Sequence, residues 1–205
     1  MPSPRREFGR PFGLLLLAVL PATPLAAQLS WNARLGATYT TSMVTDQIAG
    51  NEVTLRPTVE PTLAVEVLTP LHGKTPMEAS AELQVTTGTL ESHQNGSTTR
   101  VAGMRTFALT GGVRGRFIAP LQWRVGLGFI SYATSEKAGV FQAGAPIRPA
   151  ATAALEYDRP LTAAFHFSAA LRYDLHSFTT KQLEANGFTG SQTVHRVGLS
   201  VGVSR

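Results

Sequence analysis

The stretch "LTAAFHFSAALRYDL", residues 161–175, separates into two faces when alternate residues are taken. Successive side chains of a β-strand point to opposite sides, so each set would share one face. One set is Leu161, Ala163, Phe165, Phe167, Ala169, Leu171, Tyr173 and Leu175, and the other is Thr162, Ala164, His166, Ser168, Ala170, Arg172 and Asp174. The pattern predicts a strand with one apolar face and one polar face.

The same alternation recurs over eight stretches of ten residues or more, and no convincing helical periodicity appears after residue 27. We therefore expect an all-β chain with strands over residues 29–43, 53–68, 76–90, 101–118, 121–133, 147–158, 161–178 and 194–204. Pro57 and Pro61 lie inside the second span, and each would remove a donor from the ladder. That strand is expected to be bulged or kinked, or to begin later.

Short and long connections alternate along the chain. "TPLHGKTP", "IAPLQ" and "YDRPL" are short, whereas "VTDQIAGNE", "ESHQNGSTTR", "TSEKAGVFQAGAP" and "TTKQLEANGFTGSQ" are longer and rich in loop-forming residues. Eight antiparallel strands with short turns at one end and long loops at the other are typical of a closed up-and-down barrel, most closely of a transmembrane one. In such a barrel the N-terminus and the C-terminus both lie at the end that carries the short turns.

The large aromatic rings decide which face points outward. An eight-stranded barrel is barely wide enough inside for its own side chains, so the ring-bearing face must point out. The resulting apolar surface is larger than soluble monomers usually expose, and lipid would cover it. The rings are predicted to form two lipid-facing girdles, one near the short turns (Trp31, Phe117, Trp123, Tyr157) and one near the long loops (Tyr39, Phe107, Phe129, Tyr173). Arg105 and His195 share this face near the long loops, where charge costs about 0 to 1 kcal/mol.

The opposite face combines small residues with charges of both signs. Its predicted lumen charge network comprises Arg34, Glu60, Glu82, Arg114, Arg124, His166, Arg172, Asp174 and Arg196. Counting from the short turns places Arg34, Glu60, Glu82, Arg114, His166 and Arg196 at similar depths, and His166 is expected to hydrogen-bond to Glu60 or Glu82. Charges that are interleaved and hydrogen-bonded can fill a narrow lumen and plug it.

The first 27 residues are predicted to be a cleaved signal peptide, which leaves residues 28–205 for the barrel. Arg5, Arg6 and Arg10 precede an apolar run from Phe12 to Leu20, and prolines and small residues follow up to Ala27. Without this leader the 18 Lys and Arg lose three and the 13 Asp and Glu lose one, which leaves a net charge of +3. The remaining basic residues are scattered, so nucleic-acid binding is not expected. The absence of cysteine excludes disulfides and thiolate metal sites.

Through its leader, its eight alternating strands and its asymmetry of turns and loops, the chain resembles the small outer-membrane β-barrel family, the OmpA/OmpX-like barrels of double-membraned bacteria. The resemblance implies localisation in the outer membrane, with residues 69–76 on the inner side and the long loops outside. It implies contact with outer-membrane lipid and lipopolysaccharide, and with the assembly machinery and periplasmic chaperones during biogenesis. The family usually ends its last strand with an aromatic residue, whereas this chain ends "RVGLSVGVSR".

The tripeptide "HFS", His166 to Ser168, is similar to the His-x-Ser pair of the outer-membrane lipid A deacylase family, in which such a pair acts as base and nucleophile. Here both residues have lumen parity, and Ala169 replaces the Asn that follows in that family. The five histidines are scattered, which argues against a metal site. The glycines of "TGGVRGRF" lack the strand-turn-helix context of a phosphate loop. We therefore expect no catalytic, cofactor-binding or metal site, and no cofactor.

These observations favour a non-enzymatic bacterial outer-membrane barrel with a charge-filled lumen and surface loops that serve binding or envelope integrity. One alternative is a lipid A-modifying hydrolase that uses His166 and Ser168. The other is a secreted, lipocalin-like barrel whose apolar face turns inward around a ligand. The sequence does not identify the molecule that the long loops would bind.

Overall fold

The computed structural model describes residues 29–48, 51–71, 76–135, 147–179 and 192–205. The predicted leader lies outside these ranges. The described strands are β1 (Ser30–Thr40), β2 (Val44–Ile48), β3 (Asn51–Pro57), β4 (Glu60–Pro70), β5 (Met77–Gln94), β6 (Ser97–Ile118), β7 (Leu121–Thr134), β8 (Ile147–Pro160), β9 (His166–Phe178) and β10 (Gln192–Ser204). Within the same ranges, no helix is long and apolar enough to cross a membrane.

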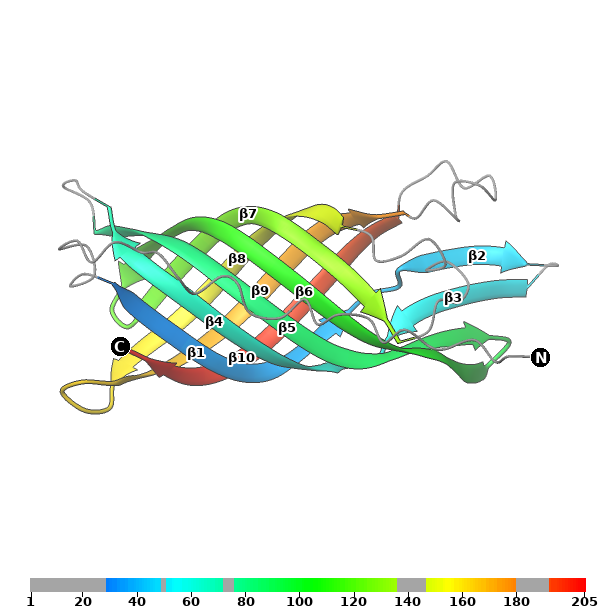
Figure 1. Ribbon diagram of the computed structural model, residues 1–205, viewed down its shortest axis with the longest axis horizontal. Helices are drawn as coiled ribbons and strands as arrows, with labels where there is room; N and C mark the ends of the chain where they lie inside the picture. The colour runs from blue at the N-terminus through cyan, green and yellow to red at the C-terminus, as the bar shows by residue number, and fades with distance from the viewer. Residues whose placement is uncertain (1–28, 49–50, 72–75, 136–146, 180–191) are drawn as a thin grey trace, which may run out of the picture.

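Eight of these strands close into a ring in the order β5, β4, β1, β10, β9, β8, β7 and β6, with β6 paired back to β5 (Figure 1). Every neighbouring pair in the ring is antiparallel. The first and last strands join from Asn32 opposite Ser204 to Thr40 opposite Arg196. The predicted all-β, eight-stranded, up-and-down transmembrane barrel is confirmed. Closure leaves no open edge in the ring, so each backbone group can find a partner without water.

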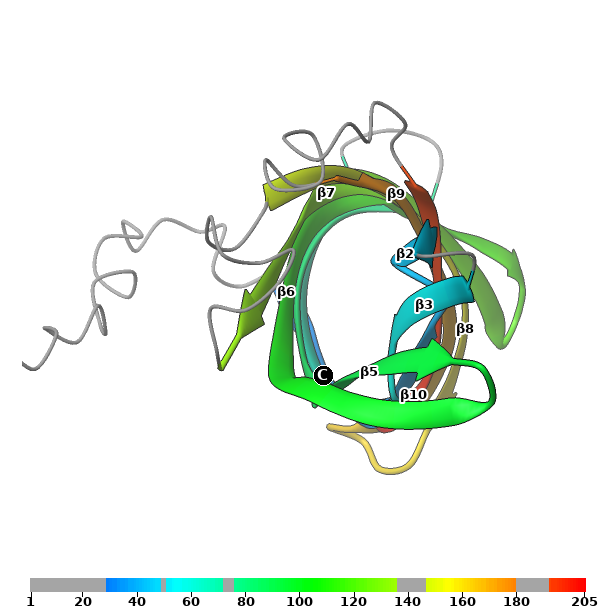
Figure 2. The same ribbon diagram turned by 90° about the vertical axis from the view of Figure 1, so that its right-hand side faces the viewer.

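Strands β2 and β3 form a hairpin that continues β1 and β4 beyond the ring at the long-loop end. The expected irregularity at the prolines is confirmed, because Pro57 ends β3 and β4 begins only at Glu60. The expectation of a loop over residues 44–52 is wrong, since β2 pairs with β3 from Val44 opposite Leu55 onward. Strand β3 pairs in turn with β5. Viewed from the long-loop end, β2 and β3 lie within the outline of the ring (Figure 2).

The stretch "ESHQNGSTTR" is also strand rather than loop. Strands β5 and β6 stay paired up to Gln94 opposite Ser97 and turn through Asn95 and Gly96. These two residues have φ of 49° and 76°, the left-handed values that a tight two-residue hairpin turn requires. The hairpin therefore projects beyond the ring beside β3.

Strand β9 begins five residues later than predicted, at His166 rather than at Leu161. The Thr162 hydroxyl accepts hydrogen bonds from the amides of Ala164 at 3.2 Å and Phe165 at 3.1 Å. These bonds hold residues 162–165 in a turn. His166 consequently lies at the mouth of the barrel.

Several glycines occupy strand positions that face the barrel interior, and they let neighbouring strands approach closely. A Cβ added to Gly128 would lie 2.0 Å from the backbone oxygen of Leu109, and one added to Gly202 would lie 1.9 Å from that of Ala33. Real Cβ atoms do not approach backbone so closely, so these positions exclude any larger residue without a shift of the strand.

Candidate functional site in the barrel interior

The polar face of the barrel lies inside the ring. With the exception of His166, all residues predicted for the charge network are buried there: Arg34, Glu60, Glu82, Arg114, Arg124, Arg172, Asp174 and Arg196. Two further acidic residues of the same parity, Glu66 and Glu156, are also buried. The interior therefore holds charges of both signs close to one another.

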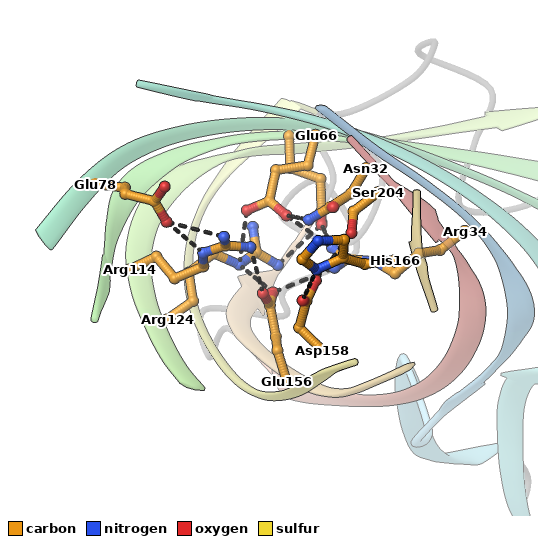
Figure 3. Close-up of polar contacts among 11 residues, drawn as sticks. Asn32, Arg34, Glu66, Glu78, Arg114, Arg124, Glu156, Asp158, His166 and Ser204 are labelled. Atoms are coloured by element: carbon orange, nitrogen blue, oxygen red, sulfur yellow. Dashed lines mark hydrogen bonds and ion pairs between the residues drawn. The ribbon is translucent and has the colours of Figure 1, made fainter. Parts of the chain in front are cut away.

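Arg34 of β1 and Arg124 of β7 contact the same three carboxylates, those of Glu66, Glu82 and Glu156, and we call these five residues the central layer. Figure 3 shows the two arginines with Glu66 and Glu156. The guanidinium of Arg34 lies 3.2 Å from Glu66, 2.5 Å from Glu82 and 3.4 Å from Glu156. That of Arg124 lies 3.5, 3.0 and 3.2 Å from the same residues. Because β1 and β7 are four positions apart around the ring of eight, the layer spans the lumen from wall to wall.

Further ion pairs extend the central layer toward both ends. On the short-turn side, Arg114 Nη2 lies 2.8 Å from Glu78 and its Nη1 lies 3.3 Å from Glu156. On the long-loop side, Arg172 contacts Glu82 and lies 2.7 Å from Asp174. In that direction Asp174 also lies 3.7 Å from Arg196, whose Nη2 is 3.9 Å from Glu60.

Little space is left between these side chains. The cavity beside the central layer, bounded by residues such as Thr38 and Gln84, has a volume of about 10 Å³. That is at the lower limit for one water molecule. The cavity beside these ion pairs is therefore too small for a solute larger than water.

An apolar cluster, here called the apolar plug, fills the lumen at the long-loop end. It consists of Met43, Val44, Leu90, Met104, Ala108, Ile130, Tyr132, Ala150, Phe178 and Val194. The rings of Tyr132 and Phe178 meet edge to face at 5.6 Å, and Tyr132 Oη is 2.6 Å from Nε2 of His176. The plug was not among the features predicted from the sequence. Its signal was present, because inner-parity positions change from polar to apolar near the long loops, as at Ile130, Tyr132 and Phe178.

His166 differs from the prediction in both place and partner. Its side chain is 44% exposed, and Nδ1 lies 2.5 Å from Oδ1 of Asp158 instead of bonding to Glu60 or Glu82. Ser204 donates a hydrogen bond to the other oxygen of Asp158 at 2.8 Å. His166 therefore belongs to a separate group at the short-turn mouth, outside the central layer (Figure 3).

The residues predicted for the two girdles lie on the outer parity of the ring. Tyr39, Phe107, Phe117, Phe129 and Tyr173 are exposed, whereas Trp31, Trp123 and Tyr157 are partly covered. Trp31 packs edge to face on Phe165 at 6.5 Å, and Tyr157 packs on Phe167 at 6.4 Å. Tyr173 Oη lies 2.5 Å from Nδ1 of His195, which gives that outer-face histidine a polar partner. The outer surface is otherwise mainly aliphatic.

Ser168, the serine of the His-x-Ser pair, lies on the inner side of β9. Its side chain is only 3% exposed, and its hydroxyl has no hydrogen-bond partner among the described residues. Among the described residues, no group of three or more His, Asp or Glu side chains is placed to hold a metal ion. The chemistry that the buried groups support is mutual charge compensation.

No protein-family model matches the sequence, and no curated protein matches it either. Solved structures do match. Neisserial surface protein A has a TM-score of 0.56 and 8% identity, over 86% of this chain and 95% of its own. The outer membrane protein OprG from Pseudomonas aeruginosa has a TM-score of 0.52 and 12% identity, over 86% and 94%. Outer membrane protein AlkL has a TM-score of 0.50 and 12% identity, over 92% and 95%. The chain therefore has the fold of the small outer-membrane β-barrel proteins, a closed ring of eight antiparallel strands that spans the membrane.

Proposed function

We propose that this chain is a non-enzymatic bacterial outer-membrane protein whose barrel is a closed scaffold and whose long loops bind partners or support envelope integrity. It would reach the outer membrane through the cleaved leader of residues 1–27. Its outer face would contact membrane lipid and lipopolysaccharide, with the short turns in the periplasm. The fold of the structural neighbours supports this location.

The observation that carries the proposal is that two obstacles stand in series along the lumen. The central layer joins both walls through Arg34 and Arg124, and the apolar plug lies between it and the long loops. An ion would have to displace paired charges and then lose its hydration shell among apolar side chains, which is costly. The barrel is thus suited to carry loops rather than to conduct.

The alternatives find less support in the geometry. A lipid-modifying hydrolase needs a nucleophile that its substrate can reach, whereas Ser168 is buried on the lumen side. A lipocalin-like barrel needs an apolar interior, but Arg34 and Glu82 face the axis while Leu127 and Phe129 face outward.

Planar-bilayer recording tests the closed scaffold. We expect no steady ion current from protein whose insertion is verified by heat-modifiable gel mobility. A stable ohmic current would contradict the proposal. An altered lipid A profile upon overexpression would contradict the non-enzymatic assignment.

The orientation is tested with single cysteines, which are unique labels because the chain contains none. Ser97→Cys lies at the tip of the β5–β6 hairpin, and Ala163→Cys lies in the turn between β8 and β9; both positions are exposed. A membrane-impermeant maleimide added to intact cells should label only the Ser97→Cys variant. Labelling of Ala163→Cys before the outer membrane is permeabilised would reverse the orientation.

A further inference from the structure

An unpaired arginine lies on the outer face of the barrel at its short-turn edge. Arg159 is the next outer-parity residue after Tyr157 on β8, and it is exposed. It forms no ion pair or hydrogen bond with the side chains that the structure describes. In β7, β8, β9, β10 and β1, the described carboxylates are Glu156, Asp158 and Asp174, and all of them have inner parity. The charge of Arg159 is therefore not balanced on its own side of the wall.

Arg159 borders a concavity of the outer wall that two aromatic rings also line. The volume of this concavity is about 480 Å³, and its lining consists of Tyr157, Arg159, Pro160, Leu161 and Phe167. Arg159 is opposite Phe167 in the β8–β9 register, and the ring of Phe167 packs edge to face on that of Tyr157 at 6.4 Å. The concavity thus joins one free guanidinium to an apolar and aromatic wall.

A second guanidinium lies on the same edge, on the other side of β9. Arg205 follows β10, and its guanidinium lies over the ring of Phe165 at 5.9 Å. Val203, two residues before Arg205, is opposite Phe167, which Arg159 faces from β8. The backbones of β8 and β10 are two strand spacings apart, or about 10 Å. The short-turn edge of the outer face is therefore cationic from β8 to β10.

The outer face of β8 and β9 stays apolar from this concavity toward the middle of the barrel. Tyr157 is opposite Ala169, and the next outer pair is Leu155 opposite Leu171, with both leucines exposed. These rows follow one another at about 7 Å along the strands. Ala169 leaves a low point between the larger side chains of Phe167 and Leu171. An acyl chain whose headgroup lies at Arg159 can follow this row.

We propose that this site binds an anionic phospholipid of the inner leaflet of the outer membrane. The proposal rests on the proposed function, which places the short turns in the periplasm. Tyr157 belongs to the predicted short-turn girdle, and girdle rings lie at the depth of the lipid headgroups. Arg159, one outer position closer to the periplasm, then meets the lipid phosphate and binds it through paired N–H donors. A zwitterionic lipid carries its own cation, which competes with Arg159, so a headgroup with net negative charge is preferred.

Nuclear magnetic resonance of the barrel in lipid nanodiscs tests this site, with phosphatidylglycerol as the probe in a background of phosphatidylcholine. As the share of phosphatidylglycerol rises, we expect saturable shifts of the Arg159 Nε signal and of the backbone amides of Tyr157 and Phe167. In Arg159→Gln the amide shifts should need about fivefold more phosphatidylglycerol, the effect of one cation at an anionic lipid surface. Arg105→Gln removes the same charge from the outer parity near the long loops and should leave the midpoint unchanged.

Inorganic phosphate separates a lipid site from a site for any phosphate. Added to nanodiscs of phosphatidylcholine alone, it should not shift the Arg159 signal, because it has no acyl chain to hold it at the wall; a saturable shift would overturn the lipid as the ligand. A midpoint that stays unchanged in Arg159→Gln, or that rises equally in Arg105→Gln, would overturn the site. The nanodiscs carry the same lipids on both faces, so these results do not depend on the orientation of the barrel. Reversed labelling of the cysteine variants would overturn the proposed orientation and the choice of leaflet alone.

Discussion

Replacement of Arg34 by Met should destabilise the barrel strongly. Arg34 is 2% exposed, and its guanidinium contacts three buried carboxylates at 2.5 to 3.4 Å. Methionine fills much of the same volume but carries no charge, so Glu66 would retain only Arg124 as an ion-pair partner among the described side chains. Removal of one partner from a buried ion pair typically costs about 3–5 kcal/mol, because the other charge stays buried and uncompensated. We expect a loss of that size in the free energy of unfolding, measured by urea titration in lipid vesicles with tryptophan fluorescence.

Arg116→Met is the matched control for this loss. Arg116 is exposed and has no ion-pair partner among the described side chains, so its substitution should change the free energy of unfolding by no more than about 0.5 kcal/mol. Addition of Glu66→Gln to Arg34→Met should recover part of the loss, since Glu66 would otherwise keep only Arg124 as an ion-pair partner among the described side chains, with a coupling of about 0.5–3 kcal/mol. Equal effects of the two arginine substitutions, or strict additivity of the double variant, would refute mutual compensation in the central layer.

Other predictions concern the two faces of the wall and the plug. Leu127→Arg, at a position 72% exposed in the middle of β7, should cost about 2–4 kcal/mol of unfolding free energy in bilayers; a change near zero would mean that this face meets water. Gly202→Ala should lower the free energy of unfolding by about 1–3 kcal/mol, because the added methyl group would overpack against Ala33. The Cβ of Gly111→Ala would lie 3.9 Å from its nearest neighbour, so this variant should keep the heat-modifiable gel mobility of the natural chain. Phe178→Ala should remove about 3–5 kcal/mol from the plug, and Phe129→Ala on the outer face much less, by the same urea titration; equal losses would argue against the plug.

The strand architecture could be predicted from the sequence because alternation is a local property. Parity assigned Arg34 and Leu35 to opposite faces without knowledge of their neighbours. Loop composition was less reliable. Residues 91–100 are rich in Ser and Thr, which favour loops in isolation but pair well across a hairpin. The Asn95–Gly96 dipeptide is the signal that could have identified that hairpin.

Contacts inside the lumen could not be predicted to the same degree. Parity identifies the inner face, but the carboxylate that each arginine meets depends on the stagger between strands that are distant in sequence. His166 illustrates this point: its depth was counted from a predicted start at Leu161, and the strand begins five residues later. The error moved the side chain from mid-barrel to the mouth, where Asp158 is its partner.

The central claim is that the ring-bearing face contacts lipid, and quenching of tryptophan fluorescence by brominated lipid tests it most directly. The chain has two tryptophans, Trp31 and Trp123, both on the outer parity near the short turns. In the single-tryptophan variants Trp31→Phe and Trp123→Phe, we predict strong quenching by lipid brominated on the acyl chain close to the headgroup, and weak quenching by aqueous iodide. Strong quenching by iodide with none by brominated lipid would contradict the account.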